Sequence, residues 1–282
     1  MALISCSACH SDNDIQLDSV APNGAKVFRC EECGNRWSPV ALTTLPAFTR
    51  TPLQMARGRF ANSSMVSPAI LAAVKRLRTK FLKAHPTAED TQIDSWTRYQ
   101  ELLTQDGLAA STAADLRELA TTGTGVRAGS MSIFNRTWKQ LGDDEAAHRT
   151  RTSIEYLLRG PGDVALEDRL THLITGTEVE GMAGLKEDFF TKMLHISEPE
   201  RFLPVLTYDD EFTGKRDITR AVFGLHLPKA DTTAMQIGRL SVWSNDLLLE
   251  LLGDDFESTH HQAEFLWWAK DRVGETALTA VR

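Results

Sequence analysis

The sequence lacks any apolar run near the roughly 18 residues that a membrane-spanning helix needs, so we expect no membrane helix. Its first ten residues, MALISCSACH, lack the basic stretch and the long apolar core of a secretory signal peptide. We therefore expect a cytoplasmic protein without a membrane partner. Cysteine is absent after residue 33, which excludes a disulfide framework for the rest of the chain.

Catalytic signatures are also missing. The chain contains no Gly-x4-Gly-Lys-Ser/Thr loop, no His-Glu-x2-His pair and no Gly-x-Ser-x-Gly turn. The segment TTGTGVRAGS (121–130) has glycines but no lysine, and it is typical of a loop between helices, with Arg127 as a candidate phosphate contact. We expect a non-enzymatic chain, and an enzyme with an unrecognised site is a third alternative.

All four cysteines lie near the start, at Cys6, Cys9, Cys30 and Cys33. The pattern is Cys-x2-Cys, 20 residues, then Cys-x2-Cys, which is the spacing of a four-cysteine structural zinc site. Four thiolates complete a tetrahedron and leave no open position for catalysis. The cofactor prediction is structural Zn²⁺, with iron second, in a small β unit whose folding depends on the metal.

The residues CSACHSDNDIQL and FRCEECGNRW resemble the zinc ribbon of TFIIS-type transcription elongation factors over residues 1–40. In those factors an acidic pair at the hairpin tip acts in the polymerase. The corresponding tip here, SVAPNGAK (19–26), has no acid, so the resemblance implies a ribbon without that activity. Arg36 and Trp37 are candidate DNA contacts. The alternative is that Trp37 packs over the ribbon while Arg36 is merely solvated.

Charge is distributed unevenly along the chain. Residues 1–84 hold 11 of the 31 Lys/Arg residues and 5 of the 38 Asp/Glu residues, a net charge of +6, so the other 198 residues carry −13. A chain that binds nucleic acid through charge would use its basic third. The alternative is ordinary variation of charge along a soluble protein.

Apolar spacing predicts a mainly α protein in which the small β zinc ribbon precedes a multi-helix body. The predicted domains are the ribbon (1–40), a linker (41–66), a helical domain (67–160) and a helical domain with a short extended segment (161–282). The expected helices follow helix-period patterns between glycine and proline breaks. They cover 67–83, 92–105, 111–121, 130–141, 143–159, 164–174, 184–195, 216–223, 233–252 and 258–271.

The helix expected at 67–83 carries cations away from its apolar stripe. Lys75, Arg76, Lys80 and Lys83 are candidate contacts for DNA phosphates. The alternative is an amphipathic helix with a soluble face.

The segment GLKEDFFTKMLHISEPERFLPVLT (184–207), then GKRDITRAVFGL (214–225), LSVWSNDLLLELLG (240–253) and AEFLWWAKD (263–271), form a second distinctive series. They resemble the region upstream of the motor in McrB-type AAA+ restriction NTPases and related defence proteins. In that family the N-terminal region selects a DNA target, often a modified one, a motor hydrolyses nucleotide and a separate nuclease subunit cuts.

The resemblance implies a non-catalytic DNA-recognition region of a McrB-like, modification-dependent restriction or phage-defence system. Its expected partners are DNA, including modified DNA, an AAA+ motor region or subunit, and a nuclease subunit. The alternative is a protein-interaction scaffold that docks motor or nuclease subunits without touching DNA, which the acidic excess of residues 85–282 favours.

Overall fold

The computed structural model divides the chain into two compact units, Met1–Arg50 and Thr51–Arg282, which are described separately. The structure describes residues 15–20, 26–31, 33–34, 36–37, 52–88, 93–121, 131–177, 181–205 and 207–272. Nothing in the described part of either unit is a helix long and apolar enough to cross a membrane.

The first unit contains a small antiparallel sheet in the order β1-β2-β3. Its strands are β1 (Ile15–Val20), β2 (Lys26–Cys30) and β3 (Arg36–Trp37). Leu17 pairs with Phe28 and Phe28 pairs with Trp37, so β2 is the central strand. After β2 the chain turns at Gly34, whose φ of 71° is a left-handed conformation that glycine adopts without strain. This turn leads the chain from Cys30 into β3.

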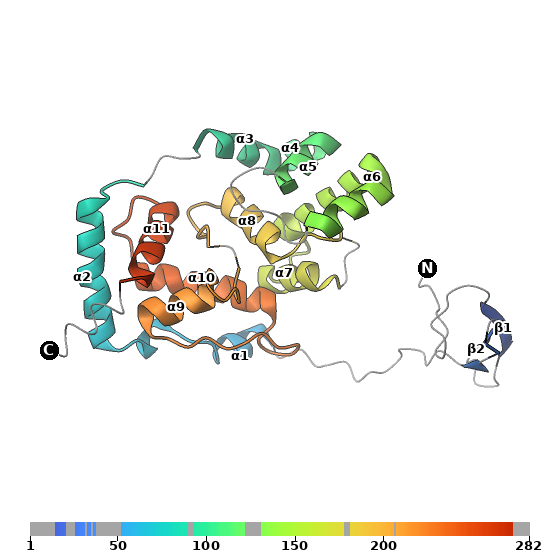
Figure 1. Cartoon of the computed structure of the whole chain (residues 1–282), viewed down its shortest axis with the longest axis horizontal. Coiled ribbons are helices and arrows are strands. Elements are labelled where there is room, and N and C mark those ends of the chain that lie inside the picture. The colour runs from blue at the N-terminus through green and yellow to red at the C-terminus, as the bar shows by residue number, and fades with distance from the viewer. Residues whose placement is uncertain are drawn as a thin grey trace. The chain divides into compact units, whose positions relative to one another are not determined.

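The second unit is helical in its described residues, which confirms the prediction of a mainly α protein (Figure 1). Its helices are α1 (Leu53–Arg57), the 3-10 helix η1 (Ser63–Met65), α2 (Pro68–Ala84), α3 (Ile93–Leu103), α4 (Gln105–Ala110), α5 (Ala113–Thr121), α6 (Met131–Arg159), α7 (Leu166–Thr175), α8 (Glu187–Ser197), α9 (Lys215–Phe223), α10 (Ile237–Leu252) and α11 (Thr259–Lys270).

Helix α10 forms the centre of this unit, with eleven of its sixteen residues buried. It crosses α7 at Gly238, where an added Cβ would lie 2.3 Å from the carbonyl oxygen of Glu167 and 2.4 Å from the nitrogen of Thr171. Only glycine allows this approach. The backbone N–H of Gly238 donates to the hydroxyl of Thr171 at 3.1 Å, so the contact also satisfies a buried polar group.

A non-helical segment after α8 lies against α10. The side chain of Asn245 on α10 accepts a hydrogen bond from the N–H of Leu203 at 2.9 Å and donates one to the carbonyl of Arg201 at 2.8 Å. Asn245 is only 1% exposed, so one amide holds two backbone groups that would otherwise be unsatisfied. The sequence predicts an extended segment here, but the N–H groups of Arg201 and Phe202 donate to the carbonyl of Glu198 at 3.0 and 3.1 Å, so the stretch begins with a turn.

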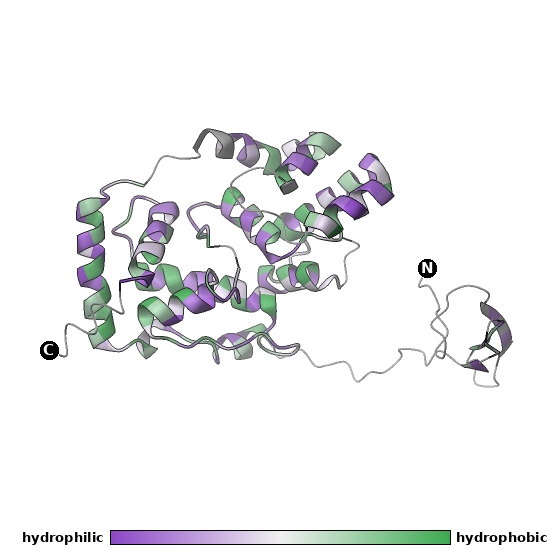
Figure 2. Ribbon diagram, viewed as in Figure 1, coloured by the Kyte–Doolittle hydropathy of each residue, from purple (hydrophilic) through white to green (hydrophobic). Residues whose placement is uncertain are grey.

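Helix α2 packs at the edge of the unit, against α9 and α11 (Figure 1). In Figure 2 hydrophilic and hydrophobic residues both occur along its length, as expected for a helix covered on one side only. Three of its seventeen residues are buried, and Phe81 is the largest of them. The Phe81 ring lies 5.2 Å from the ring of His261 and 5.5 Å from that of Phe265, both on α11.

Two differences from the sequence prediction concern domain limits. Residues 53–66, inside the segment predicted as a linker, form α1 and η1 and bury Phe60, whose ring lies 5.6 Å from the ring of Trp243. The second is at residue 160, where a boundary was predicted. Helices on both sides contribute to one hydrophobic core, and the Tyr156 hydroxyl is hydrogen-bonded to His172 across that point at 2.7 Å. Tertiary contacts of this kind leave no local signal in the sequence.

The break predicted near residue 142 lies within α6. Gly142 has φ 78° and ψ 168°, which are not helical angles, so α6 consists of two helical stretches that meet there. The indole N–H of Trp138 donates to Asp143 at 2.7 Å across the break. This agrees with the prediction of separate helices at 130–141 and 143–159.

The ring of Phe81 joins α2 to α11, so its removal should loosen α2. We expect Phe81→Ala to lower the free energy of unfolding by about 3–5 kcal/mol, because a buried aromatic ring is replaced by a cavity. Urea unfolding followed by circular dichroism measures the change. The matched control is Phe212→Ala, since Phe212 is 71% exposed and its loss should change stability by no more than about 0.5 kcal/mol. Equal effects of the two changes would contradict the packing described for α2.

Candidate nucleic-acid interface

Helix α2 presents a row of cations to solvent. The Ser67 hydroxyl caps its first turn by accepting from the N–H of Ile70 at 3.3 Å, and Pro68 occupies the first helical position. From this start, helical periodicity turns Lys75, Arg76, Lys80 and Lys83 away from the core, and all four are exposed. We call these four residues the basic face. Two small side chains, Ala72 and Thr79, are also exposed on this side of the helix.

The basic face has no acidic neighbours on its own helix. Between Glu32 and Glu89 the sequence contains no Asp or Glu. Within the part of the chain that the structure describes, none of the four cations of the basic face forms an ion pair. The helix spans about 12 Å from Lys75 to Lys83 at the usual rise per residue. A polyanion lying along α2 would therefore meet four cations without displacing a carboxylate.

The fifth cation of α2, Arg78, is bound within the protein itself. Its guanidinium donates to the carbonyl of Leu252 at 2.6 Å and pairs with Asp255 at 2.8 Å. Arg78 therefore gives a hydrogen-bond partner to a carbonyl at the C-terminal end of α10, where the helix itself provides none. Arg78 stabilises the fold, and the basic face is left to the other four.

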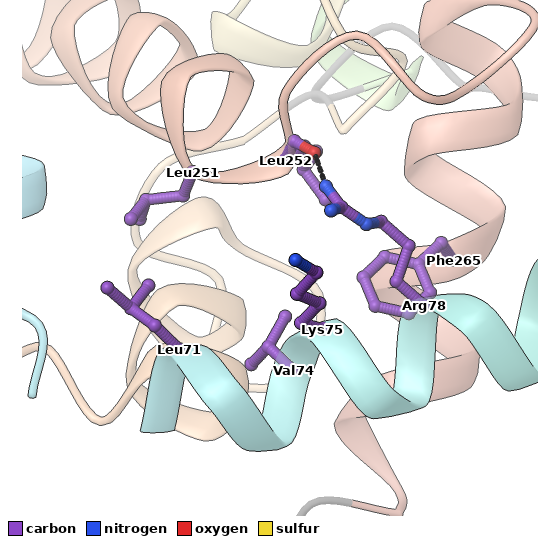
Figure 3. A pocket seen from close by; sticks show the side chains of 7 residues that line it. All are labelled: Leu71, Val74, Lys75, Arg78, Leu251, Leu252 and Phe265. Carbon is purple, nitrogen blue, oxygen red and sulfur yellow. Dashed lines mark hydrogen bonds between the residues drawn. The ribbon is translucent and has the colours of Figure 1, made fainter. Parts of the chain in front are cut away.

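A small pocket of about 180 Å³ borders the basic face at Lys75, between α2 and the end of α10 (Figure 3). Leu71, Val74, Leu251, Leu252 and Phe265 provide its apolar lining. Figure 3 shows Lys75 and Arg78 projecting from α2 toward the end of α10. We call this the α2 pocket. No sequence pattern predicts it, because its walls come from residues far apart in the chain.

In the first unit, Arg36 is exposed but paired. Its guanidinium lies 3.1 Å from the carboxylate of Asp18 on β1, and 62% of the Arg36 side chain is accessible. An exposed pair of this kind contributes roughly 0–1 kcal/mol, so it would compete only weakly with a phosphate. The predicted contact Trp37 lies beside Arg36 in β3, and its backbone pairs with Phe28.

The structure describes two of the four cysteines, at the end of β2 and in the turn that follows it. Cys30 ends β2 and is fully buried, whereas Cys33 is exposed in the following turn. The N–H of Gly34 donates to the carbonyl of Cys30 at 2.9 Å and closes the turn. Cys6, Cys9 and the predicted phosphate contact Arg127 lie outside the described residues. Among the described residues alone, no group of three or more metal-ligating side chains occurs.

The interior of the second unit contains charged groups that the sequence did not point to. Lys215 at the start of α9 donates to the hydroxyl of Ser241 on α10 at 3.4 Å. Glu187 at the start of α8 accepts from the N–H of Tyr208 at 2.8 Å. Burial raises the pKa of Glu187 to about 7 and lowers the pKa of Lys215 to about 8, and their mutual attraction opposes both shifts.

Lys192 on α8 is a third buried ionisable group, 3% exposed, and its ammonium donates to the carbonyl of Leu119 on α5 at 3.0 Å. Burial lowers the pKa of Lys192 to about 8 because the charged form loses hydration. The folded state therefore binds fewer protons than the unfolded state between about pH 8 and the ordinary lysine value near 10.4. The stability cost of the charge is present below pH 8 and disappears as pH rises through this window.

We expect the free energy of unfolding to rise between pH 8 and 10, with Lys192 contributing up to about 3 kcal/mol at the end of the titration. Lys192→Met should remove that part of the rise. The contribution of Lys215, which titrates in the same pH window, should remain. Urea unfolding at a series of pH values measures the effect, with exposed Lys139→Met as the control. If the free energy of unfolding rises equally with pH in Lys192→Met and in the unchanged chain, the lowered pKa of Lys192 is contradicted.

The basic face brings together four of the predicted DNA contacts, whereas Arg36 and Trp37 belong to the other unit. Comparison of the chain with models of known protein families, with characterised proteins and with solved structures gives no match.

Proposed function

We propose that this chain is the non-catalytic DNA-recognition region of a McrB-like restriction or phage-defence system. The basic face is the observation that supports DNA contact. Its four cations are exposed on a helix without acidic residues, and none of them forms an ion pair within the described part of the chain. Assignment to a restriction system rests on the sequence resemblance of residues 184–271. In such a system an AAA+ motor and a nuclease subunit would act on the DNA that this region holds.

Phosphate contacts suit the chemistry of the basic face. Lys and Arg neutralise phosphates and release the counterions bound to DNA, which favours binding without reading sequence. Base recognition would require further groups that reach into a groove, for which Arg36 and Trp37 in the first unit are candidates. In that case α2 would supply phosphate contacts and therefore affinity, and the first unit would add contacts to the bases.

Neutralising the basic face should weaken DNA binding and its dependence on salt. We expect Lys75→Gln/Arg76→Gln/Lys80→Gln to reduce affinity for a duplex at least about tenfold at low salt. The slope of log K against log salt should become shallower by up to about 3, since each lost phosphate contact removes about 0.9. Fluorescence anisotropy on plain and cytosine-modified duplexes measures both quantities.

The matched control neutralises three exposed cations elsewhere, Arg136→Gln/Lys139→Gln/Lys229→Gln, which changes net charge by the same amount. Equal losses in both triple variants would mean that only net charge matters and α2 is no interface. Absence of binding to any duplex at low salt would overturn the DNA-recognition proposal itself.

The proposed cofactor of the first unit is one structural Zn²⁺ held by Cys6, Cys9, Cys30 and Cys33. Support comes from the cysteine spacing and from the turn at Gly34 that follows buried Cys30. A unit of 50 residues buries little apolar surface, so metal binding would supply much of its folding free energy.

We expect about one zinc per chain by elemental analysis. Cys30→Ser should lose the metal and unfold the first unit, whereas unfolding of Thr51–Arg282 should be unchanged because that unit has its own core. The control variant Arg36→Ala/Trp37→Ala should keep its zinc, and its DNA affinity reports whether these two side chains touch DNA. Full zinc content in Cys30→Ser would refute the four-cysteine site.

The second candidate is a protein-interaction scaffold, favoured by the exposure of Phe212 and by the acidic excess beyond residue 85. In that case motor or nuclease subunits co-purify with the chain, and the Gln variant of the basic face leaves the DNA binding of the whole assembly unchanged.

A further inference from the structure

Phe212 is the most exposed large apolar side chain among the described residues, at 71%. It belongs to the segment 208–214, which we call the Phe212 loop and which leads into α9. A single exposed phenylalanine is common on protein surfaces and needs no explanation by itself. The loop that presents this one is held in place by several hydrogen bonds.

Hydrogen bonds fix the backbone on both sides of the ring. The Asp210 carboxylate accepts from the N–H of Phe212 at 3.0 Å and from that of Thr213 at 2.8 Å. The N–H of Gly214 donates to the carbonyl of Asp210 at 3.1 Å, and the ammonium of Lys270 donates to the carbonyl of Phe212. A ring presented by such a loop would lose little conformational freedom on binding, which is a property of interface anchors.

The Phe212 loop has its acids immediately before the ring, at Asp209, Asp210 and Glu211. Asp209 is paired with Arg216, while Asp210 is engaged in capping the loop. Glu211 is exposed beside Phe212 and forms none of the ion pairs found among the described residues. A surface that receives Phe212 should therefore combine an apolar hollow with a cation at its edge.

The α2 pocket has that combination. Its 180 Å³ compares with the roughly 150 Å³ of an engineered apolar cavity that holds one benzene ring. Leu71, 38% exposed, and Lys75, also exposed, lie at its surface, so the pocket is accessible from solvent (Figure 3). The pocket offers a hydrophobic contact for one ring and an ammonium group for an adjacent carboxylate.

Phe212 cannot reach the α2 pocket of its own copy. Phe265 of α11 lines the α2 pocket, whereas Lys270 of α11 holds the Phe212 loop. Five residues along a helix correspond to a rotation of about 140°, so the pocket and the loop lie on different sides of α11. Each copy thus has one anchor and one pocket that face apart.

We propose that two copies associate head to tail, with Phe212 of one copy in the α2 pocket of the next and Glu211 opposite Lys75. A contact between two different surfaces of the same chain leaves one of each unused, so it continues into an open chain or closes into a ring. The contact area is small against the roughly 1,600 Å² of a standard interface, so association is weak and depends on protein concentration. This inference does not depend on DNA binding.

The test uses the full chain without DNA, by sedimentation velocity over a concentration series up to about 1 mM, the range for weak association. We expect the unchanged chain to form dimers and larger species, and high salt to weaken them. Phe212→Ala, which removes the anchor, and Leu71→Gln, which makes the pocket mouth polar without changing charge, should each weaken association at least about tenfold.

Mixing the two variants gives the decisive result. Phe212→Ala still has an intact pocket and Leu71→Gln still has an intact anchor, so the mixture should form one-to-one dimers that grow no further. Met55→Gln, which alters another exposed apolar side chain of 55% exposure, should associate like the unchanged chain. A monomeric unchanged chain at every concentration, growth that survives Phe212→Ala, or a mixture without dimers would each overturn the proposal.

Discussion

The close crossing of α7 and α10 at Gly238 is the constraint on which the rest of the second unit depends. With the backbones this near, the polar groups beside the crossing lose water and must find partners in the protein. Arg239 is 1% exposed and donates to both oxygens of Asp168, at 2.7 and 3.3 Å. The two-pronged geometry fixes the rotation of one helix against the other, so the buried pair contributes more to register than to net stability.

Helices at the edge of the unit are covered on one side only and keep the other side for solvent. Helix α2 is the clearest case, with its apolar stripe on α9 and α11 and Arg78 binding the end of α10. The acid that pairs with α2, Asp255, lies in the segment after α10 and binds Arg78. The outer side of α2 carries four cations and no acid. Like charges four residues apart repel one another slightly, a cost that the packing of α2 on α9 and α11 offsets.

Local patterns predicted much of this fold. Ser67-Pro68 marked the start of α2, and the break at Gly142 divided two helical stretches as expected. The same patterns failed where contacts distant in sequence decide the structure. Phe60 lies in a segment that contains Pro52 and many polar residues. Only the contact of Phe60 with Trp243 shows why this segment is folded. Lys192 is charged but buried, which hydrophobic periodicity cannot indicate. The basic face was predictable from helical spacing; the α2 pocket and the rigid Phe212 loop were not.

Lys75 links the two surfaces proposed for α2, since it belongs to the basic face and also lines the α2 pocket. A carboxylate brought to Lys75 by a neighbouring copy would neutralise one of four cations facing DNA, and Arg76, Lys80 and Lys83 would remain. If both contacts use Lys75 fully, each must weaken the other by the same factor, because coupling between binding sites is reciprocal. If the lysine side chain turns between them, head-to-tail copies would instead align successive basic faces, and DNA binding would gain from multivalency. The sign of this coupling therefore depends on one flexible side chain at the edge of the pocket.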